Sequence, residues 1–331
     1  MKSMFWGNAN TIHLVYPDDV VQALGEKAGL DTERVYGKAD LGTAATEEVR
    51  FLFGTWGFEG LNAQEIATYF PKLEAVFYAA GSVQGFARPF LASGVRVFSA
   101  WAANAVPVAE FTLAQILLAN KGFFRTTEKF SRGDRDGLDR IKNAYPGNYN
   151  CKVGIIGAGM IGKLVIELLK RHHVQVLVYD PFLPDETAAA LGVEKTTLER
   201  LFSECQTVSN HLANNAQTVG MLNGALFEKM KYGATFLNTG RGAQVVEDDL
   251  CRVLEQRPDL TAVLDVTDPE PPLEGSRFFT LPNVVLTPHI AGSIGTEVQR
   301  LSVYMLEECE RLLGSGDVRY EVTESMLATM A

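Results

Sequence analysis

Three residues in the second half of the chain have side chains that could work together on a carbonyl group: Arg241, Glu270 and His289. An imidazole can donate or accept a proton near neutral pH, and a carboxylate beside an imidazole favours its charged form and fixes its orientation. A guanidinium can bind a carboxylate through two hydrogen bonds and stabilise a neighbouring oxygen as it gains charge. The three side chains therefore suit proton transfer to a carbonyl group that lies next to a carboxylate.

Each of the three residues also has a purely structural alternative. Arg241, in ATFLNTGRG, could form a surface salt bridge, and Glu270, in LDVTDPEPP, could be a solvated loop acid. His289 is favoured among the histidines because it follows an apolar strand in VVLTPHIAGS. The other four lie near the N-terminus, at a helix end or inside a strand-like run: His13, His172, His173 and His211. Three strand ends that offer Arg, Glu and His together favour the chemical interpretation.

A glycine pattern in the middle of the chain indicates where a dinucleotide binds. Gly157, Gly159 and Gly162 form G-x-G-x-x-G between an apolar strand and an amphipathic helix, and Asp180 ends the next strand. The glycines permit a tight turn, a close approach of the backbone to a pyrophosphate, and close packing of helix on strand. Asp180 can accept hydrogen bonds from ribose hydroxyls and would repel a 2′-phosphate, which favours NAD over NADP. The alternative is a glycine turn in a sheet that binds no dinucleotide.

The second half of the chain has the alternating pattern of a parallel sheet. Apolar runs rich in Val, Ile and Leu, separated by helical patterns, occur at residues 152–157, 174–180, 207–213, 234–240, 261–267 and 283–287. Strands that are apolar throughout are typical of a sheet covered by helices on both faces. Ligands bind at the carboxyl ends of such strands, which is where this pattern puts the histidine.

The first hundred residues show a looser version of the same alternation. We expect strands at 49–55, 75–79 and 95–100 and a helix at 62–70. These elements predict a smaller α/β domain. A helix is expected from Pro107 to Gly122, because proline suits a first helical position and glycine suits a helix end. The charged, turn-rich stretch 121–142 is expected to be a solvated excursion or an interface arm.

Composition limits the class of protein. The 331 residues, 47% hydrophobic and 21% charged, suffice for two domains with apolar cores. A net charge of -10 has the wrong sign for binding nucleic-acid phosphates, so no nucleic-acid partner is expected. The sequence has no long uninterrupted apolar run, so we expect a cytoplasmic chain with no membrane partner. The four cysteines are widely spaced and predict reduced core thiols, and no metal site is expected.

With these motifs in place, the sequence resembles the D-isomer-specific 2-hydroxyacid dehydrogenase family over nearly its whole length. Four motifs carry the resemblance in a specific order: GAGMIG with Asp180, FEKMKYGATFLNTGRG, LDVTDPEP and TPHIAG. The resemblance implies NAD-dependent interconversion of a 2-keto acid and a D-2-hydroxy acid. It gives Arg241 the role of anchoring carboxylate and carbonyl, Glu270 that of setting the pKa of the histidine, and His289 that of acid-base catalyst.

The resemblance also implies an architecture. A Rossmann-type doubly wound parallel sheet is inserted into a smaller, flavodoxin-like α/β substrate domain, and the active site is the cleft between the two. The implied boundaries are 1–106 and 299–331 for the substrate domain and 107–298 for the NAD-binding domain. A homodimer through the cofactor domain is expected, with the bridging helix and the arm after it as the contact.

The resemblance assigns binding roles to further residues. The family's glycine-rich loop aligns with AAGSVQGF, so the backbone amides of Ala80, Gly81 and Ser82 are expected to hold the substrate carboxylate. Asn104 matches the family's motif at the start of the bridging helix. Contacts with NAD are expected from Gly157, Gly159, Met160, Ile161, Gly162, Asp180, Thr239, Gly292 and, on the nicotinamide carboxamide, Asp265. The loop departs from the family at Gln84, which leaves the identity of the acid open.

Two alternative functions stay open at this stage. A binding protein that senses NAD(H), like the corepressors that share this fold, can keep the same Arg, Glu and His. A phosphite-oxidising dehydrogenase can keep them too. Glu270 argues against a formate dehydrogenase, because that branch pairs its histidine with glutamine. Turnover of a 2-keto acid would separate the enzyme from the sensor.

Overall fold

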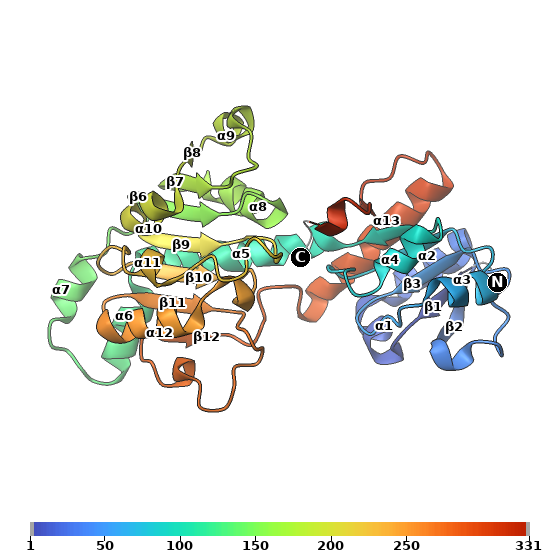
Figure 1. Ribbon diagram of the computed structural model, residues 1–331, viewed down its shortest axis with the longest axis horizontal. Coiled ribbons are helices and arrows are strands. Elements are labelled where there is room, and N and C mark those ends of the chain that lie inside the picture. Colours follow the sequence, from blue (N-terminus) through green and yellow to red (C-terminus); the bar gives the residue numbers. More distant parts are fainter. Residues whose placement is uncertain (1–2, 329–331) are drawn as a thin grey trace. The chain divides into compact units, whose positions relative to one another are not determined.

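The computed structural model describes residues 3–328 and divides the chain into two compact units. Unit 1 runs up to Asn104 and resumes at Ser293, and unit 2 is Ala105–Gly292. Each unit has its own sheet, with the first and last parts of the chain (blue to teal, and red) in unit 1 and the middle part in unit 2 (Figure 1). The predicted fold class, an α/β domain inserted into another α/β domain, is confirmed.

Unit 1 contains a six-stranded sheet with the order β13-β5-β4-β3-β1-β2, in which β13 is antiparallel to β5 and the other pairs are parallel. Its strands are β1 (Ser3–Trp6), β2 (Leu30–Tyr36), β3 (Phe51–Gly54), β4 (Ala75–Tyr78), β5 (Arg96–Ser99) and β13 (Glu321–Val322). Its helices are α1 (Ala9–Val15), α2 (Asp18–Ala28), α3 (Ala63–Tyr69), α4 (Ala87–Ala92) and α13 (Gln299–Leu313). Short 3₁₀ turns are η1 (Lys38–Asp40), η4 (Gly295–Val298) and η5 (Met326–Ala328).

Aromatic side chains hold the central strands of unit 1 together. Phe53, Phe77 and Phe98 are paired in register on β3, β4 and β5, and adjacent rings stack with centroids 4.9 Å apart. This ladder lies on the face covered by α1, α2 and α13, and the opposite face packs on α3 and α4. Because the strands are buried on both faces, they read as continuous apolar runs, which is why three of them were predicted. The strands β1 and β2 and the helices beside them were missed.

Unit 2 contains a seven-stranded parallel sheet with the order β12-β11-β10-β9-β6-β7-β8. Its strands are β6 (Tyr149–Ile156), β7 (His173–Tyr179), β8 (Glu194–Lys195), β9 (Thr207–Asn210), β10 (Thr235–Asn238), β11 (Thr261–Leu264) and β12 (Val284–Leu286). Its helices are α6 (Phe123–Ser131), α7 (Leu138–Asn143), α8 (Met160–Leu169), α9 (Asp185–Leu191), α10 (Leu198–Glu204), α11 (Gly224–Phe227) and α12 (Glu247–Gln256), with 3₁₀ turns η2 (Gly242–Gln244) and η3 (Arg277–Phe279). Each of the six predicted apolar runs overlaps one of these strands.

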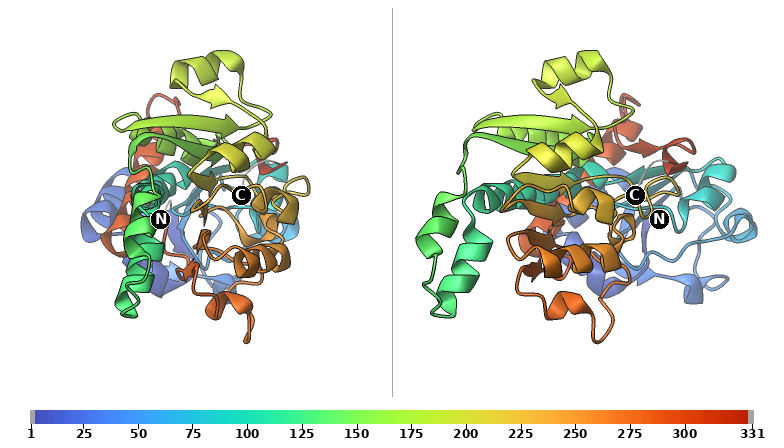
Figure 2. Two further views of the ribbon diagram at one scale, coloured as in Figure 1. Left: turned by 90° about the vertical axis from the view of Figure 1, so that its left-hand side faces the viewer. Right: turned by 60° about the vertical axis from the view of Figure 1, so that its left-hand side comes forward.

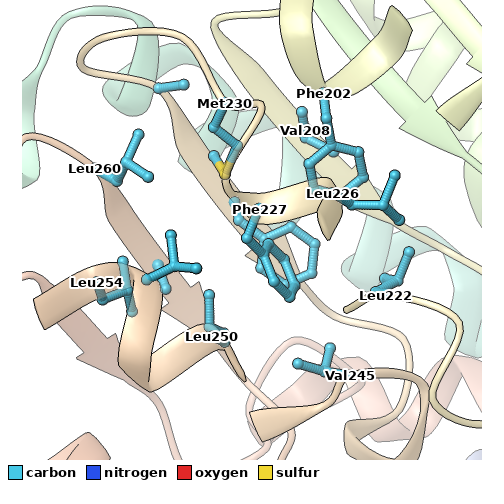
Figure 3. Packing of buried hydrophobic residues seen from close by; sticks show 14 of the residues in the cluster. Phe202, Val208, Leu222, Leu226, Phe227, Met230, Val245, Leu250, Leu254 and Leu260 are labelled. Carbon is cyan, nitrogen blue, oxygen red and sulfur yellow. The ribbon is translucent and has the colours of Figure 1, made fainter. Parts of the chain in front are cut away.

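Alternate strand residues of unit 2 face two separate cores. On one face, Phe202 of α10, Phe227 of α11 and Phe236 of β10 form a ring cluster. Figure 3 shows Phe202 and Phe227 among the apolar side chains of this core. On the other face, residues such as Ile155 and Leu237 pack on α8 and on the long helix α5. The strand order reverses between β6 and β9, and ligands of such sheets bind outside the carboxyl ends of the strands at that reversal.

Helix α5 (Trp101–Asn120) begins in unit 1 and continues into unit 2, so the predicted start at Pro107 was wrong. Pro107 lies inside the helix, where its missing N–H costs one hydrogen bond but does not end the element. The structural units change at Asn104 and Gly292, two and six residues before the expected boundaries at 106 and 298. Within residues 3–328, α5 is the one helix with the length and composition to cross a membrane, and half of it is buried in the structure, as in a core helix.

The stretch 121–142 is more ordered than its sequence indicated. It forms α6 and most of α7, which pack on each other and stand apart from the sheet of unit 2 (green in Figure 2). Gly122 adopts a φ of +68° between α5 and α6, and a side chain there would collide with the ring of Tyr145. Most of its charged residues are exposed, as expected, and those between Arg132 and Asp136 lie in the turn that joins the two helices.

Candidate functional site

The glycine turn after β6 leaves one open space at the N-terminus of α8. Gly157 has a φ of +88°, and a Cβ there would lie 2.8 Å from the carbonyl oxygen of His211. A Cβ on Gly162 would lie 2.0 Å from the carbonyl oxygen of Gly157, so helix and turn can pack this closely only with glycine. At Gly159, a Cβ would meet nothing within 4 Å. The turn therefore has the two tight positions and the one open position that a bound pyrophosphate requires.

Asp180 follows β7 and is hydrogen-bonded to the glycine turn. Its Oδ2 accepts a hydrogen bond from the amide of Ala158 (2.7 Å), and its Oδ1 accepts one from the amide of Phe182 (2.8 Å). Each carboxylate oxygen keeps a further lone pair, so the group can still accept hydrogen bonds from ribose hydroxyls. A 2′-phosphate would be placed against this negative charge. The residues at the reversal of the sheet thus fit a dinucleotide without that phosphate.

The other residues expected to contact NAD lie at the same edge of unit 2. Met160 and Ile161 form the first turn of α8, and Gly292 is the last residue of the unit. Thr239 is buried just after β10, where its hydroxyl lies 3.2 Å from the hydroxyl of Thr112 in α5. This contact ties the end of β10 to the helix that crosses the sheet.

A network of buried amide side chains positions the backbone of Arg241. The Nδ2 of Asn210, at the end of β9, donates to Oδ1 of Asn238 (3.0 Å) and Oε1 of Gln244 (2.6 Å). The Nδ2 of Asn238 donates to the carbonyl of Arg241 (3.1 Å), and the amide of Arg241 donates to Oε1 of Gln244 (3.2 Å). The three amide side chains are essentially inaccessible to solvent. Sequence reasoning missed them, although polar residues at two buried strand ends were a visible signal.

The guanidinium of Arg241 is a partly buried cation with one protein acceptor. Its Nη1 donates to the carbonyl of Gly240 (2.8 Å). Burial lowers the pKa of Arg241, and the negative charge of Glu270 acts in the opposite direction. Arginine keeps its charge in proteins, and no carboxylate lies within ion-pair distance of this guanidinium in the described part of the chain. The remaining donors are available for an anion.

Gly242 allows the arginine turn to approach the loop that carries Glu270. A Cβ at this position would lie 2.0 Å from the carbonyl carbon of Thr267 and 2.4 Å from the amide nitrogen of Asp268. These contacts are far below van der Waals distance, so any side chain here would push the two segments apart. The glycine therefore sets the separation between the loops that hold Arg241 and Glu270.

Asp265 supports the turn that carries the histidine. Its Oδ1 accepts hydrogen bonds from the hydroxyl of Thr287 (2.5 Å) and the amide of Ile290 (2.9 Å), and its Oδ2 accepts one from the amide of Ala291 (2.9 Å). The side chain is buried at the end of β11. A contact with the nicotinamide carboxamide was expected from the resemblance, and the structure adds this bracing of the histidine turn.

His289 and Glu270 form a hydrogen-bonded pair. His289 has a φ of +54°, a conformation that is uncommon for a residue with a side chain and that requires support from its surroundings. Its amide donates to the carbonyl of Asp265 (3.1 Å). Its Nδ1 donates to Oε1 of Glu270 at 2.5 Å, and both side chains remain partly exposed. The carboxylate fixes the ring and leaves Nε2 free to exchange a proton with a bound molecule.

The loop after β4 in unit 1 presents two open amides. The amide of Ala80, which was also expected to hold the substrate carboxylate, donates to the carbonyl of Tyr78 (2.8 Å). Among the described residues, the amides of Gly81 and Ser82 donate to no protein acceptor. Two successive free N–H groups in a loop form a concavity that suits an anion.

Asn104 lies beside this loop and joins the two places where the chain passes between the units. Its Oδ1 accepts a hydrogen bond from the amide of Ser293 (3.0 Å), and its Nδ2 lies next to Gly81. The chain leaves unit 1 after Asn104 and returns to it at Ser293. The side chain therefore holds the two crossing segments together on the unit 1 side.

The remaining histidines do not form a comparable pair. His211 is fully buried at the end of β9, where its Nε2 lies 2.8 Å from the hydroxyl of Ser209 and its Nδ1 has no partner. Burial lowers its pKa to about 3, so it is neutral under physiological conditions. His13, His172 and His173 lie on α1, after α8 and at the start of β7. His289 is thus the histidine with a carboxylate partner.

The four cysteines are buried free thiols, as the sequence indicated. Burial raises the pKa of each of them, to about 12 for Cys205 and Cys309, which makes them unreactive. Within residues 3–328, no group of three or more His, Cys, Asp or Glu side chains is arranged to hold a metal ion. The four cysteines are therefore core residues with no expected chemical role.

Comparisons with known proteins agree with the resemblance. The D-isomer specific 2-hydroxyacid dehydrogenase, NAD binding domain, is the family whose model matches residues 113–291, more than half of the chain. The chain is 33% identical over 208 residues to YoaD of Bacillus subtilis, covering 60% of this chain and 58% of YoaD. It is 32% identical over 214 residues to a D-3-phosphoglycerate dehydrogenase of Archaeoglobus fulgidus, covering 64% of this chain and 40% of that protein. The chain thus spans less than two thirds of either relative.

The fold is also found among solved structures. A phosphoglycerate oxidoreductase from Rhizobium etli matches with a TM-score of 0.80 and 19% identity, over 98% of this chain and 99% of that chain. At this identity, the likeness shows the fold alone. It covers both units, whereas the family match lies within α5 and unit 2.

Proposed function

The chain belongs to the D-isomer specific 2-hydroxyacid dehydrogenase family, and from this premise we propose that it interconverts a 2-keto acid and the corresponding D-2-hydroxy acid with NAD. The observation that carries the proposal is the hydrogen bond of 2.5 Å between Nδ1 of His289 and Oε1 of Glu270. A carboxylate in this position orients the imidazole for proton transfer through Nε2 and stabilises the ring when it is charged.

The residues that would hold NAD are those at the reversal of the sheet in unit 2. The open position at Gly159 and the first turn of α8 would take the pyrophosphate, and Asp180 would accept hydrogen bonds from the ribose. We assign the nicotinamide side of the site to Thr239, Asp265 and Gly292. When bound, the dinucleotide supplies or accepts the hydride of the reaction.

His289 moves the proton in this proposal. In the reduction, Nε2 of the charged ring gives its proton to the keto oxygen while the keto carbon gains the hydride. The ring is then neutral, and Nδ1 stays hydrogen-bonded to Glu270. In the oxidation, neutral Nε2 takes the proton from the hydroxyl group. Glu270 holds the imidazole ring in place, and its negative charge stabilises the ring while His289 is protonated.

The carboxylate of the substrate is assigned to two kinds of donor. The guanidinium of Arg241 can bind a carboxylate oxygen and the keto oxygen together, because its planar donors match two neighbouring acceptors. In unit 1, the amides of Gly81 and Ser82, with Asn104 beside them, are donors that suit a carboxylate, as the resemblance to the family implies. The hydrogen bond from the guanidinium to the keto oxygen strengthens as charge develops on that oxygen, whereas the bonds to the carboxylate stay the same through the reaction.

The proposal is tested by following NADH oxidation with glyoxylate, hydroxypyruvate, pyruvate and longer 2-keto acids. Turnover of at least one of them is expected, with NADH preferred to NADPH because of Asp180. In the reverse direction, D-2-hydroxy acids should be oxidised and L-isomers should not. Tight NADH binding without turnover of any acid would instead support the NAD(H)-sensing alternative.

A homodimer in the cytoplasm completes the proposal. The large apolar side chains Phe123 and Phe130 are exposed on α6, 44% and 58% respectively, as is Leu118 on α5 at 37%. Helix α6 stands apart from the sheet of unit 2 (Figure 2), so its exposed apolar side chains suit a contact with a second copy. Sedimentation of the purified chain should give twice the mass of one chain, and a monomer would remove this part of the proposal.

A further inference from the structure

The segment that follows β13 packs beneath the loop that presents the two open amides in unit 1. Leu327 is 3% exposed and lies in the same apolar cluster as Val83, Phe86 and Ala87. These residues belong to the loop after β4 and to the start of α4. The two segments are more than 230 residues apart in sequence, so this contact is a product of the fold and left no local pattern.

Gln84 closes the same contact with a hydrogen bond. Its Nε2 donates to the carbonyl of Leu327 at 2.5 Å, and its Oε1 accepts a hydrogen bond from Nη1 of Arg88 at 3.3 Å. Gln84 lies two residues beyond Ser82, at the position where this loop departs from the family pattern. The side chain that distinguishes the loop is therefore the one that ties it to the C-terminal segment.

Ser99 joins the loop to the chain that leads into β13. Its amide donates to the carbonyl of Tyr320 (3.1 Å), and its hydroxyl lies 2.9 Å from the carbonyl oxygen of Ala80 and 2.5 Å from that of Gly81. Next to it, Arg96 forms a two-fold ion pair with Glu321 across the β5-β13 pair, at 2.7 and 2.6 Å. Ser99 is fully buried, so its hydroxyl serves these carbonyls and no solvent.

The bonds made by Ser99 determine where the two free amides point. In a trans peptide, the C=O of one residue and the N–H of the next point in opposite directions. The carbonyls of Ala80 and Gly81 are directed toward Ser99. The N–H groups of Gly81 and Ser82, which belong to the same two peptide units, must therefore point away from Ser99. Both amides are thus aimed before any anion arrives.

We propose that Ser99, Gln84 and the C-terminal segment ending at Leu327 act as a positioning scaffold that fixes the anion-binding loop and so sets the affinity for the substrate carboxylate. This inference rests on the proposed function for the identity of the anion. None of these residues touches the reacting atoms. They act through the two peptide units, and the loop keeps its form only while the C-terminal segment remains docked.

The central test is Ser99→Ala in the full chain. The Ala80 carbonyl keeps a hydrogen bond from the amide of Ala100 (3.0 Å), whereas among the described residues the Gly81 carbonyl accepts a hydrogen bond only from the Ser99 hydroxyl. The variant therefore releases the peptide that carries the Ser82 amide. Because the carboxylate is bound equally in ground and transition states, KM for the 2-keto acid should rise about tenfold while kcat stays within about twofold. NADH affinity should not change.

Further variants distinguish a role in positioning the anion-binding loop from a general contribution to the stability of the fold. Gln84→Met keeps the size of the side chain and removes its donor, and should raise KM in the same way, by a smaller factor. Leu327→Ala should raise KM too, and Leu327→Met should restore it. Ser93→Ala is the matched control, because the Ser93 hydroxyl donates to the carbonyl of Pro89 (2.8 Å) in the same unit, away from the loop. It should leave KM unchanged.

Hydrogen exchange measures how well the loop after β4 is ordered, and it does not require the chain to turn over a substrate. The amides of Phe86 and Ala87 donate to the carbonyl of Val83, so their protection reports the order of the loop. Protection should fall in Ser99→Ala and Gln84→Met but not in Ser93→Ala. If the wild-type chain reduces no 2-keto acid, the proposed function fails while this exchange result still decides the scaffold. Unchanged protection together with unchanged KM in both loop variants would overturn the inference.

Discussion

In unit 2 the candidate reactive groups are side chains that other side chains hold in place, whereas in unit 1 the candidate binding groups are backbone amides. In unit 2, an amide network fixes the backbone of Arg241, Asp265 braces the histidine turn, and Glu270 holds the ring of His289. In unit 1, the open donors are the amides of two small residues, aimed by a buried serine. The chemical step needs a group that can gain and lose a proton, which only a side chain provides. Binding a carboxylate needs fixed donors, and peptide N–H groups serve that purpose.

This difference has a consequence for mutational effects. Loss of a reactive side chain removes the step itself, so the rate should fall steeply. Loss of a residue that aims a peptide weakens binding and leaves the step intact. Variants in unit 2 should therefore mainly lower the rate, and variants in the loop of unit 1 should mainly weaken substrate binding.

The largest effect is expected for His289→Ala. Without Nε2, no side chain described here can give a proton to the keto oxygen, so kcat/KM should fall by about 10³-fold, within the range found for acid-base catalysts. The affinity for NADH, measured by fluorescence titration, should stay near that of the wild type. His172→Ala is the control, because His172 lies after α8 and away from the strand ends that carry the chemistry. A fall of less than tenfold for His289→Ala would show that His289 is not the acid-base catalyst.

The residues of unit 2 that we propose for the chemistry could be selected from the sequence because their types stand at recognisable positions. Gly159, Arg241, Glu270 and His289 each follow an apolar strand, and the parallel sheet brings those strand ends to one edge. The pairing of Glu270 with His289 was predicted, and the hydrogen bond is present. The strained φ of His289 was not, because it depends on Asp265 and on the turn as a whole.

The supports of both sites could not be predicted, because each one depends on residues far apart in sequence. Asn210 reaches Gln244, and Gln84 reaches Leu327. Pro107 misled the placement of the bridging helix, because a proline after the first turn is tolerated where the rest of the helix is packed. The hydrogen bond from the amide of Ala80 to the carbonyl of Tyr78 was not predicted either. Local patterns carry no information about such contacts.

Adding a methyl group to one glycine in each unit tests how tightly the backbone is constrained in the two places. In unit 2, Gly242→Ala places a Cβ 2.0 Å from the carbonyl carbon of Thr267 and must separate the loops of Arg241 and Glu270. Misplacement of reacting groups by about 1 Å costs about 100-fold in rate, so kcat/KM should fall by that factor. In unit 1, a Cβ on Gly85 meets nothing within 4 Å. Gly85→Ala should leave kcat and the thermal midpoint close to wild type.

The control for this pair is the fold of unit 2 itself. Circular dichroism and NADH binding should show that Gly242→Ala remains folded at the assay temperature. Equal losses of activity in the two variants would contradict the comparison, since the loop of unit 1 would then be as tightly constrained as the turn of unit 2.

The smallest expected effect is a response of unit 2 to acid, caused by His211. Burial lowers the pKa of His211 to about 3, whereas the ordinary value in an unfolded chain is 6.5. Between these two values the unfolded chain binds a proton that the folded chain does not. The free energy of unfolding therefore has its full value, as far as His211 is concerned, above pH 6.5. It declines as the pH falls toward 3, by about 2 kcal/mol at pH 5. Carboxylates such as Glu204, whose pKa the Arg200 guanidinium lowers to about 2, act only below about pH 4.5.

Glu247, whose pKa burial raises, also titrates in this range, but it would make stability rise rather than fall as the pH is lowered. A loss of stability between pH 6.5 and 4.5 is therefore assigned to His211, and the two units can be followed separately within this range. The three tryptophans, Trp6, Trp56 and Trp101, all belong to unit 1, so intrinsic fluorescence reports that unit. Hydrogen exchange of the amides in β9 reports unit 2. Protection in β9 should fall between pH 6.5 and 4.5 while fluorescence stays constant, and His211→Asn should flatten this pH dependence even if it lowers stability at pH 7. Fluorescence that changes first, or an unaltered pH dependence in the variant, would place the acid response outside the strand ends that carry the chemistry.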